Sequence, residues 1–97
     1  MKVFTRLERD YCLSKADPAV HYAGTFAAKE AAVKAFRSLR MGMGIVTIRD
    51  FQVYHEDNGL PQVKFLKTNG GFVAVDMKLS ISHTAESAVA VVIATTP

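Results

Sequence analysis

A carboxylate and an ammonium stand four residues apart in a run of small residues, and this pair is the first candidate for chemistry in the sequence. The run is Ala27–Lys34, read AAKEAAVK, with Glu30 as the carboxylate and Lys34 as the ammonium. Residues four apart share one face of a helix, and Ala23 and Ala27 leave that face shallow. Such a face could hold a metal ion and a phosphate. Such spacing more often marks an exposed ion pair worth about 0.2–0.5 kcal/mol to the helix, and both interpretations remain open.

The other side chains with reactive or metal-binding groups are scattered along the sequence. His83 stands at the end of an alternating segment, where it is either a structural residue or a ligand. His21 and His55 have no companion at the spacing of metal ligands, so we predict both at the surface. Cys12 is the single cysteine, and its place in an expected helix favours burial over nucleophilic use. These residues predict no zinc site.

Length and composition fit one domain over residues 1–97. Hydrophobic residues make up 49% of the chain and charged residues 22%, which is ordinary for a globular protein. No apolar run approaches the roughly 20 residues of a membrane span, and Met1–Arg6 lacks the apolar stretch of a signal peptide. One cysteine excludes an internal disulfide, and the basic residues are not interleaved with aromatic ones. We therefore expect a cytoplasmic protein that binds neither membrane nor nucleic acid.

Two helices are expected in the first forty residues. Phe4–Leu13 reads as a short helix, and Asp17-Pro18 is a strong start for a long one that should end near Arg37. The larger apolar residues of the long helix form one stripe at helical spacing, and its small residues form a second, smooth face. The stripe comprises Tyr22, Phe26, Val33 and Phe36, and the smooth face comprises Gly24, Ala28, Ala31, Ala32 and Ala35. We expect the stripe to pack on the rest of the protein.

The remaining sequence has the patterns of strands. Asn58-Gly59 is a strong hairpin signal between the first two segments, and the last segment is apolar throughout, as in a strand buried on both faces. The expected strands are Thr47–Tyr54, Leu60–Leu66, Met77–His83 and Ala88–Ala94, with a short helix or turn at Phe72–Asp76. The order of elements predicts an α+β fold in which a long helix packs on a small antiparallel sheet.

Together these segments resemble the holo-acyl-carrier-protein synthase family of 4'-phosphopantetheinyl transferases. The most specific match is Ala23–Ala35, read AGTFAAKEAAVKA. Phe4–Cys12, the hairpin from Asp50 to Pro61, and Ser80–Ala90 are similar to other segments of that family, in the same order. The resemblance covers nearly the whole chain, and it implies a 4'-phosphopantetheinyl transferase-like fold.

The resemblance also implies a reaction and its site. Members of the family transfer the 4'-phosphopantetheine arm of coenzyme A to a serine of apo acyl carrier protein, as in fatty acid biosynthesis, with Mg²⁺ bound at the diphosphate. By the resemblance, Glu30 would bind the metal, and Lys29 and Lys34 would lie at the coenzyme, Lys34 near the diphosphate. Ser82 and His83 would lie near its nucleotide end. The family implies a homotrimer with sites between neighbouring subunits.

The chain departs from the family pattern at several points. It lacks the family's opening strand, whose Gly-x-Asp motif supplies a second metal ligand. Thr25 stands where a basic residue is usual, Phe36-Arg37 where a glycine is expected, and the region Lys67–Asp76 is shorter than the family's helix. Two hypotheses follow: an active transferase, or a non-catalytic relative that binds acyl carrier protein or assembles with an active subunit.

Overall fold

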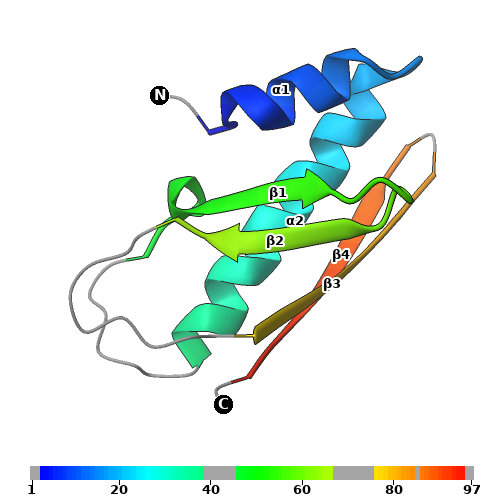
Figure 1. Ribbon diagram of the computed structural model, residues 1–97. Helices are drawn as coiled ribbons and strands as arrows, with labels where there is room; N and C mark the ends of the chain where they lie inside the picture. Colours follow the sequence, from blue (N-terminus) through cyan, green and yellow to red (C-terminus); the bar gives the residue numbers. More distant parts are fainter. Residues whose placement is uncertain (1–2, 39–45, 67–75, 85, 96–97) are drawn as a thin grey trace.

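A long helix carries two antiparallel hairpins in the computed structural model, which describes residues 3–38, 46–66, 76–84 and 86–95 (Figure 1). The class is α+β, as predicted. The helices are α1 (Arg6–Leu13), α2 (Pro18–Ser38) and the 3₁₀ turn η1 (Ile48–Asp50), and the strands are β1 (Phe51–His55), β2 (Pro61–Phe65), β3 (Asp76–His83) and β4 (Ala88–Thr95). The expected short helix or turn at 72–76 lies outside the described residues, apart from Asp76, which begins β3.

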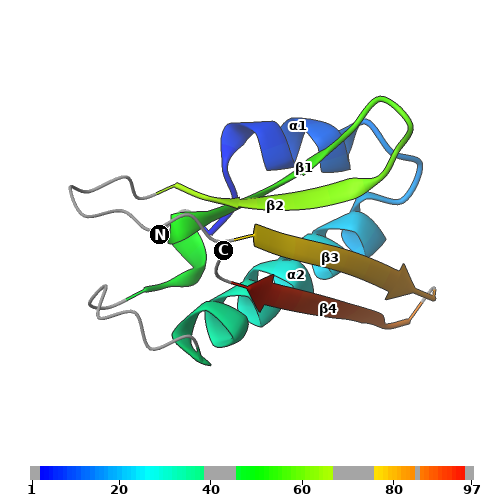
Figure 2. The ribbon, with the colours of Figure 1, turned by 60° about the horizontal axis from the view of Figure 1, so that its bottom comes forward.

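The four strands pair as two hairpins. β1 pairs with β2 from Phe51↔Phe65 to His55↔Pro61, and β3 pairs with β4 from Asp76↔Thr95 to His83↔Ala88. Within the described residues no hydrogen bonds join the two hairpins into one sheet. The hairpins lie side by side, with β2 next to β3, and together they cover α2 (Figure 2).

The first hairpin begins later than the sequence predicted. Thr47 precedes a 3₁₀ turn that ends with Asp50, and the Thr47 backbone N–H donates to the Asp50 carboxylate at 2.8 Å. This local hydrogen bond competes with strand pairing, so β1 starts only at Phe51. At the other end, Gly59 takes a positive φ of 86°, which glycine adopts without strain, and closes the predicted turn.

Helix α2 packs through its small residues and through the C-terminal part of the predicted apolar stripe. Ala28 and Ala32 are fully buried together with Val33 and Phe36, whereas Phe26 is 39% exposed. A Cβ placed on Gly24 would lie 3.1 Å from Cγ2 of Ile81, so β3 approaches the helix too closely for larger side chains on this face. The expectation that Phe26 packs inward is therefore wrong, whereas Val33 and Phe36 are buried as predicted and Tyr22 is half-buried against Phe4.

Strand β4 buries one face and exposes the other. Ala90, Val92 and Ala94 pack against the core, while alternate residues face outward. Those outward residues are Val89, Val91 and Ile93, exposed by 62%, 56% and 61%. A single copy of the chain therefore does not bury β4 on both faces, as the unbroken apolar pattern had predicted. Side chains of one type on both faces hide the two-residue period of a strand.

Candidate active site

Glu30 and Lys34 are both exposed residues of α2. Among the ion pairs between described residues, none joins their side chains. The intrahelical ion pair between Glu30 and Lys34, one of the two interpretations of their spacing, is therefore not formed. Both charged groups are free to meet a ligand from solvent.

Lys29 points the opposite way, into the protein. Its ammonium is completely buried, lies 2.8 Å from the carboxylate of Glu8, and donates a 2.6 Å hydrogen bond to the Val3 carbonyl. This position disagrees with the expected contact between Lys29 and coenzyme A, because the charge is already paired and closed off from solvent. The family signature places two lysines near each other in sequence, but only Lys34 is exposed.

Glu8 is the centre of this buried network. One carboxylate oxygen accepts from Lys29 and from the Thr5 N–H at 2.7 Å, and the other accepts from the Val53 N–H at 2.7 Å. The same carboxylate thereby caps α1 and ties it to α2 and β1. Sequence reasoning missed this role, although the spacing Thr5-x-x-Glu8 is that of a capping box.

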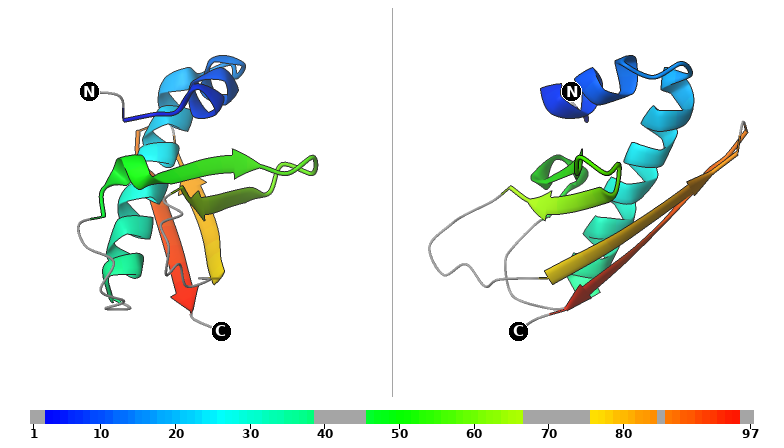
Figure 3. Two further views of the ribbon diagram at one scale, coloured as in Figure 1. Left: turned by 60° about the vertical axis from the view of Figure 1, so that its left-hand side comes forward. Right: turned by 45° about the vertical axis from the view of Figure 1, so that its right-hand side comes forward.

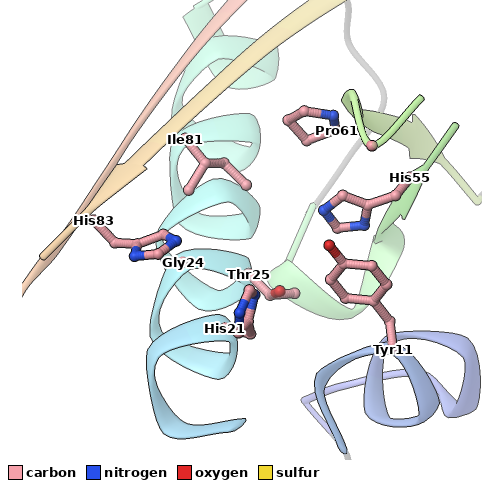
Figure 4. A pocket seen from close by; sticks show the side chains of 9 residues that line it. Tyr11, His21, Gly24, Thr25, His55, Pro61, Ile81 and His83 are labelled. Carbon is pink, nitrogen blue, oxygen red and sulfur yellow. The ribbon is translucent and has the colours of Figure 1, made fainter. Parts of the chain in front are cut away.

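The three histidines, which lie far apart in the sequence, come together in one pocket. A pocket of about 170 Å³ opens between α1, α2, β3 and the first hairpin, and His21, His55 and His83 all line it with Tyr11 (Figure 4). His55 stacks on Tyr11 with ring centroids 3.7 Å apart, and the His21 and His83 rings meet edge to face at 5.5 Å. The prediction that His21 and His55 are plain surface residues is wrong.

The pleat of β3 separates the two residues that we expected to act together. His83 and Ile81 line the pocket, whereas Ser82 is exposed and does not line it. Successive side chains of a strand point to opposite faces, so a ligand in the pocket would meet His83 but not the side chain of Ser82.

Burial and neighbouring charges lower the pKa of two of the three histidines in this pocket, His21 and His55. Burial is the main cause that lowers the pKa of His21, followed by the charges of His83 and Lys15, while Asp17 partly opposes them. Burial, Lys15 and His21, in that order, lower the pKa of His55. Since unperturbed histidine titrates near pH 6.5, both rings are mostly neutral at pH 7.

Cys12 is buried, as predicted, beneath the same part of α2. Burial raises the pKa of its thiol, a contact of 3.8 Å with the Thr25 hydroxyl lowers it, and the Glu8 carboxylate raises it further. A buried thiol with a raised pKa is a poor nucleophile. Thr25, which stands where the family usually has a basic residue, is itself buried against Cys12 and cannot supply that charge.

The residues that could hold a metal ion are few. No three His, Cys, Asp or Glu side chains of the described ranges lie close enough together to form a site of their own. Glu30 offers one exposed carboxylate, which suits a hard cation only if other oxygen ligands complete its shell. Glu30 and Lys34 do not line the histidine pocket, so one copy of the chain presents two separate candidate half-sites, the charged pair on α2 and the histidine pocket.

Comparison with known proteins identifies the family. The sequence model of the 4'-phosphopantetheinyl transferase superfamily matches residues 1–92. The chain belongs to that superfamily. Holo-[acyl-carrier-protein] synthase of Chlorobium limicola is 42% identical over 86 residues, and that of Syntrophus aciditrophicus is 37% identical over 100 residues. The chain spans 64% of the length of the first relative and 73% of the second.

The fold agrees with this assignment. A solved structure of Mycobacterium tuberculosis acyl carrier protein synthase matches with a TM-score of 0.78 and 32% identity, over 98% of this chain and 82% of the other. A segment of a large fungal protein, the fatty acid synthase alpha subunit of Emericella nidulans, is also similar, with 38% identity over 100 residues. The predicted fold and family are therefore confirmed. None of the described helices has the length and apolar character needed to cross a membrane.

Proposed function

We propose that this protein transfers the 4'-phosphopantetheine arm of coenzyme A to a serine of apo acyl carrier protein. The serine hydroxyl attacks the β-phosphorus, the bond from that phosphorus to the bridging oxygen breaks, 3',5'-ADP leaves, and the hydroxyl proton passes to solvent. The observation that carries the proposal is the exposed Glu30 and Lys34 on one face of α2, within the segment AGTFAAKEAAVKA of a family member.

Each half-site has a part in this proposal. Glu30 would hold Mg²⁺, which neutralises the diphosphate when bound. Lys34, one helical turn further along, would place its ammonium at the same diphosphate. The pocket of His83 would receive the nucleotide end of coenzyme A, where the imidazole rings and Tyr11 offer flat surfaces and hydrogen-bonding groups.

A homotrimer would bring the half-sites together. Glu30 does not line the histidine pocket of its own chain, and in the proposed trimer a ligand would touch the pocket of one copy and Glu30 of its neighbour. The outward face of β4 with Val89, Val91 and Ile93 is the apolar surface available for that contact. We place the assembled enzyme in the cytoplasm and in fatty acid biosynthesis, the setting that the family suggests.

The alternative function is that of a non-catalytic relative which binds acyl carrier protein or an active subunit. One observation favours it: a hard cation usually needs one or two carboxylates besides substrate phosphates, and the outward face of α2 supplies only Glu30 within the described residues. We therefore expect weak magnesium binding and slow transfer by the 97 residues alone.

Incubation with apo acyl carrier protein, coenzyme A and Mg²⁺, followed by the mass of the carrier, tests the proposal. The reaction is run with the 97-residue chain and with the same chain preceded by a Gly-x-Asp strand, which adds a second carboxylate. We expect slow modification in the first case and faster modification in the second. No modification in either case would exclude the transferase and leave the non-catalytic alternative.

A further inference from the structure

His21 and His83 are the two imidazole rings in direct contact among the described residues. Their centroids lie 5.5 Å apart, and the ring planes are inclined by 64°. His21 belongs to α2, whereas His83 is the last residue of β3. Figure 4 shows the His21 ring with His83 on one side and the stacked Tyr11 and His55 on the other. The pair therefore bridges a helix and the end of a strand.

The separation of these two rings is that of imidazoles which share one metal ion. Zinc-bound imidazole nitrogens lie about 2.0–2.1 Å from the ion in a tetrahedral shell, which places the centroids of two such rings about 5.3 Å apart. The observed separation of 5.5 Å between His21 and His83 is close to that value. We therefore expect one ion to reach a nitrogen of each ring by rotation of the side chains, without movement of α2 or β3.

Both rings are open to an ion from solvent. His83 is exposed, His21 is half-buried, and both line the pocket of about 170 Å³. Within the described residues neither ring takes part in a hydrogen bond, so no donor occupies their nitrogen lone pairs. Burial lowers the pKa of His21, and the neutral ring is the form that binds metals.

The other potential ligands in this part of the molecule are already engaged. His55 lies flat on Tyr11, with centroids 3.7 Å apart, and the Cys12 thiol is buried against the Thr25 hydroxyl at 3.8 Å. No three His, Cys, Asp or Glu side chains of the described ranges gather around one point. An ion held by the two rings would therefore take its remaining ligands from water or from a molecule in solution.

Coordination, rather than attraction to charge, would select the ion. Lys15 lies above the Tyr11 ring at 4.6 Å and opposes positive charge at His21, while Asp17 favours it. The two charges offset each other, and no carboxylate lines the pocket within the described residues. Imidazole suits zinc, nickel and copper, whereas magnesium and calcium prefer oxygen ligands. The pocket should thus distinguish between ions of equal charge.

We propose that His21 and His83 bind a divalent ion of the zinc class and that this ion ties α2 to the end of β3. Two imidazole nitrogens and two oxygen ligands from solvent complete its tetrahedral shell. Because the two histidines lie far apart in the unfolded chain, the ion binds the folded state preferentially and stabilises it. This site is distinct from the magnesium site proposed at Glu30, and it does not rest on the proposed function.

Calorimetric titration of the tag-free protein with zinc, without coenzyme A, tests the site at pH 7.5, about one unit above the ordinary pKa of histidine. We expect one Zn²⁺ per chain, a raised midpoint of thermal unfolding, and no displacement of zinc by an excess of Mg²⁺. Loss of one ligand in His21→Gln or His83→Gln should weaken zinc binding at least about tenfold.

His55→Gln is the matched control, because it removes an imidazole of the same pocket that is stacked on Tyr11. This variant should bind zinc as tightly as wild type. Equal zinc affinity in His21→Gln and wild type would overturn the proposal, and so would an equal loss of affinity in His55→Gln and His21→Gln. Displacement of zinc by Mg²⁺ would show attraction to charge only and would overturn it as well.

NMR of the wild-type protein keeps the test independent of how well the variants fold. Zinc should shift the ring resonances of His21 and His83 more than those of His55. Equal shifts of all three histidines, or no shift at saturating zinc, would refute the assignment. Carrier modification measured without zinc tests the proposed transferase alone, so either conclusion can fail while the other stands.

Discussion

Glu8 is the residue on which the orientation of the candidate site depends. Its carboxylate is buried with the Lys29 ammonium and accepts three hydrogen bonds that join α1, α2 and β1. Adjacent residues of a helix point about 100° apart. Lys29 is buried and the next residue, Glu30, is exposed, so the ion pair inside the protein holds α2 in the orientation that leaves the candidate metal ligand outside it.

Replacement of Lys29 by methionine should destabilise the protein strongly. Glu8 would keep its backbone donors but lose its counter-ion inside the protein, a change that typically costs about 3–5 kcal/mol. Urea unfolding measures the difference. Arg6→Gln is the control, since Arg6 pairs with Asp10 at 3.8 Å on the surface, and loss of such a pair costs about 0–1 kcal/mol. Equal stability of Lys29→Met and wild type would contradict the importance of the buried pair.

Single residues were the hardest part of the site to predict. The sequence indicated Glu30 and Lys34 because their spacing is local. Glu8 and Lys29 are 21 residues apart, and their contact depends on how α1 lies across α2. The histidines gather only after α2, β1 and β3 have packed, so no spacing in the sequence could reveal their pocket. The separation of Ser82 from His83 could be predicted from the sequence, because successive side chains of a strand point to opposite faces.

At the scale of elements, α2 is the helix against which both hairpins pack. Figure 3 shows the β3–β4 hairpin running along α2 while the β1–β2 hairpin extends across it. The helix start at Pro18 and the alanine content were sufficient to predict the element. Hydrophobicity predicted the buried Val33 and Phe36 but not the exposed Phe26, because close approach of β3 at Gly24 selects small residues on that face.

A larger side chain at Gly24 should separate α2 from β3. Gly24→Leu would overlap Ile81, and overpacking of this kind costs about 1–3 kcal/mol or more. Ala23→Leu makes a similar change at an exposed position of the same helix and should cost little. Thermal unfolding compares the two variants. A stability of Gly24→Leu equal to that of Ala23→Leu would show that the close approach is not required.

At the scale of the whole molecule, the outward face of β4 is a row of apolar side chains exposed to solvent. Val89, Val91 and Ile93 lie in a row on the second hairpin, opposite the side that packs on α2. In the proposed trimer this row is covered by a neighbouring copy. The sequence predicted the fold class, the order of elements and the family. An unbroken apolar strand pattern does not tell whether the second face of the strand is covered by its own chain or by a neighbouring one.

Val91→Lys should therefore dissociate the trimer without unfolding the protein. A charge in a closed apolar contact opposes association, whereas in a monomer the side chain stays in water. Light scattering after size exclusion gives the mass, and circular dichroism reports the fold. Ala19→Lys adds the same charge at an exposed site on α2 and should remain trimeric. A wild-type protein that is monomeric at micromolar concentration would contradict the proposed assembly.

The most direct test of the central claim is the effect of magnesium on coenzyme A affinity. Calorimetric titration compares wild type, Glu30→Gln and the control Glu86→Gln, which removes an exposed carboxylate from the β3–β4 turn. If Glu30 holds the ion at the diphosphate, Mg²⁺ tightens coenzyme A binding in wild type and Glu86→Gln but not in Glu30→Gln. All three should unfold within about 0.5 kcal/mol of one another, as surface substitutions usually do. An equal magnesium effect in Glu30→Gln and wild type would contradict the assignment of Glu30 as the metal ligand.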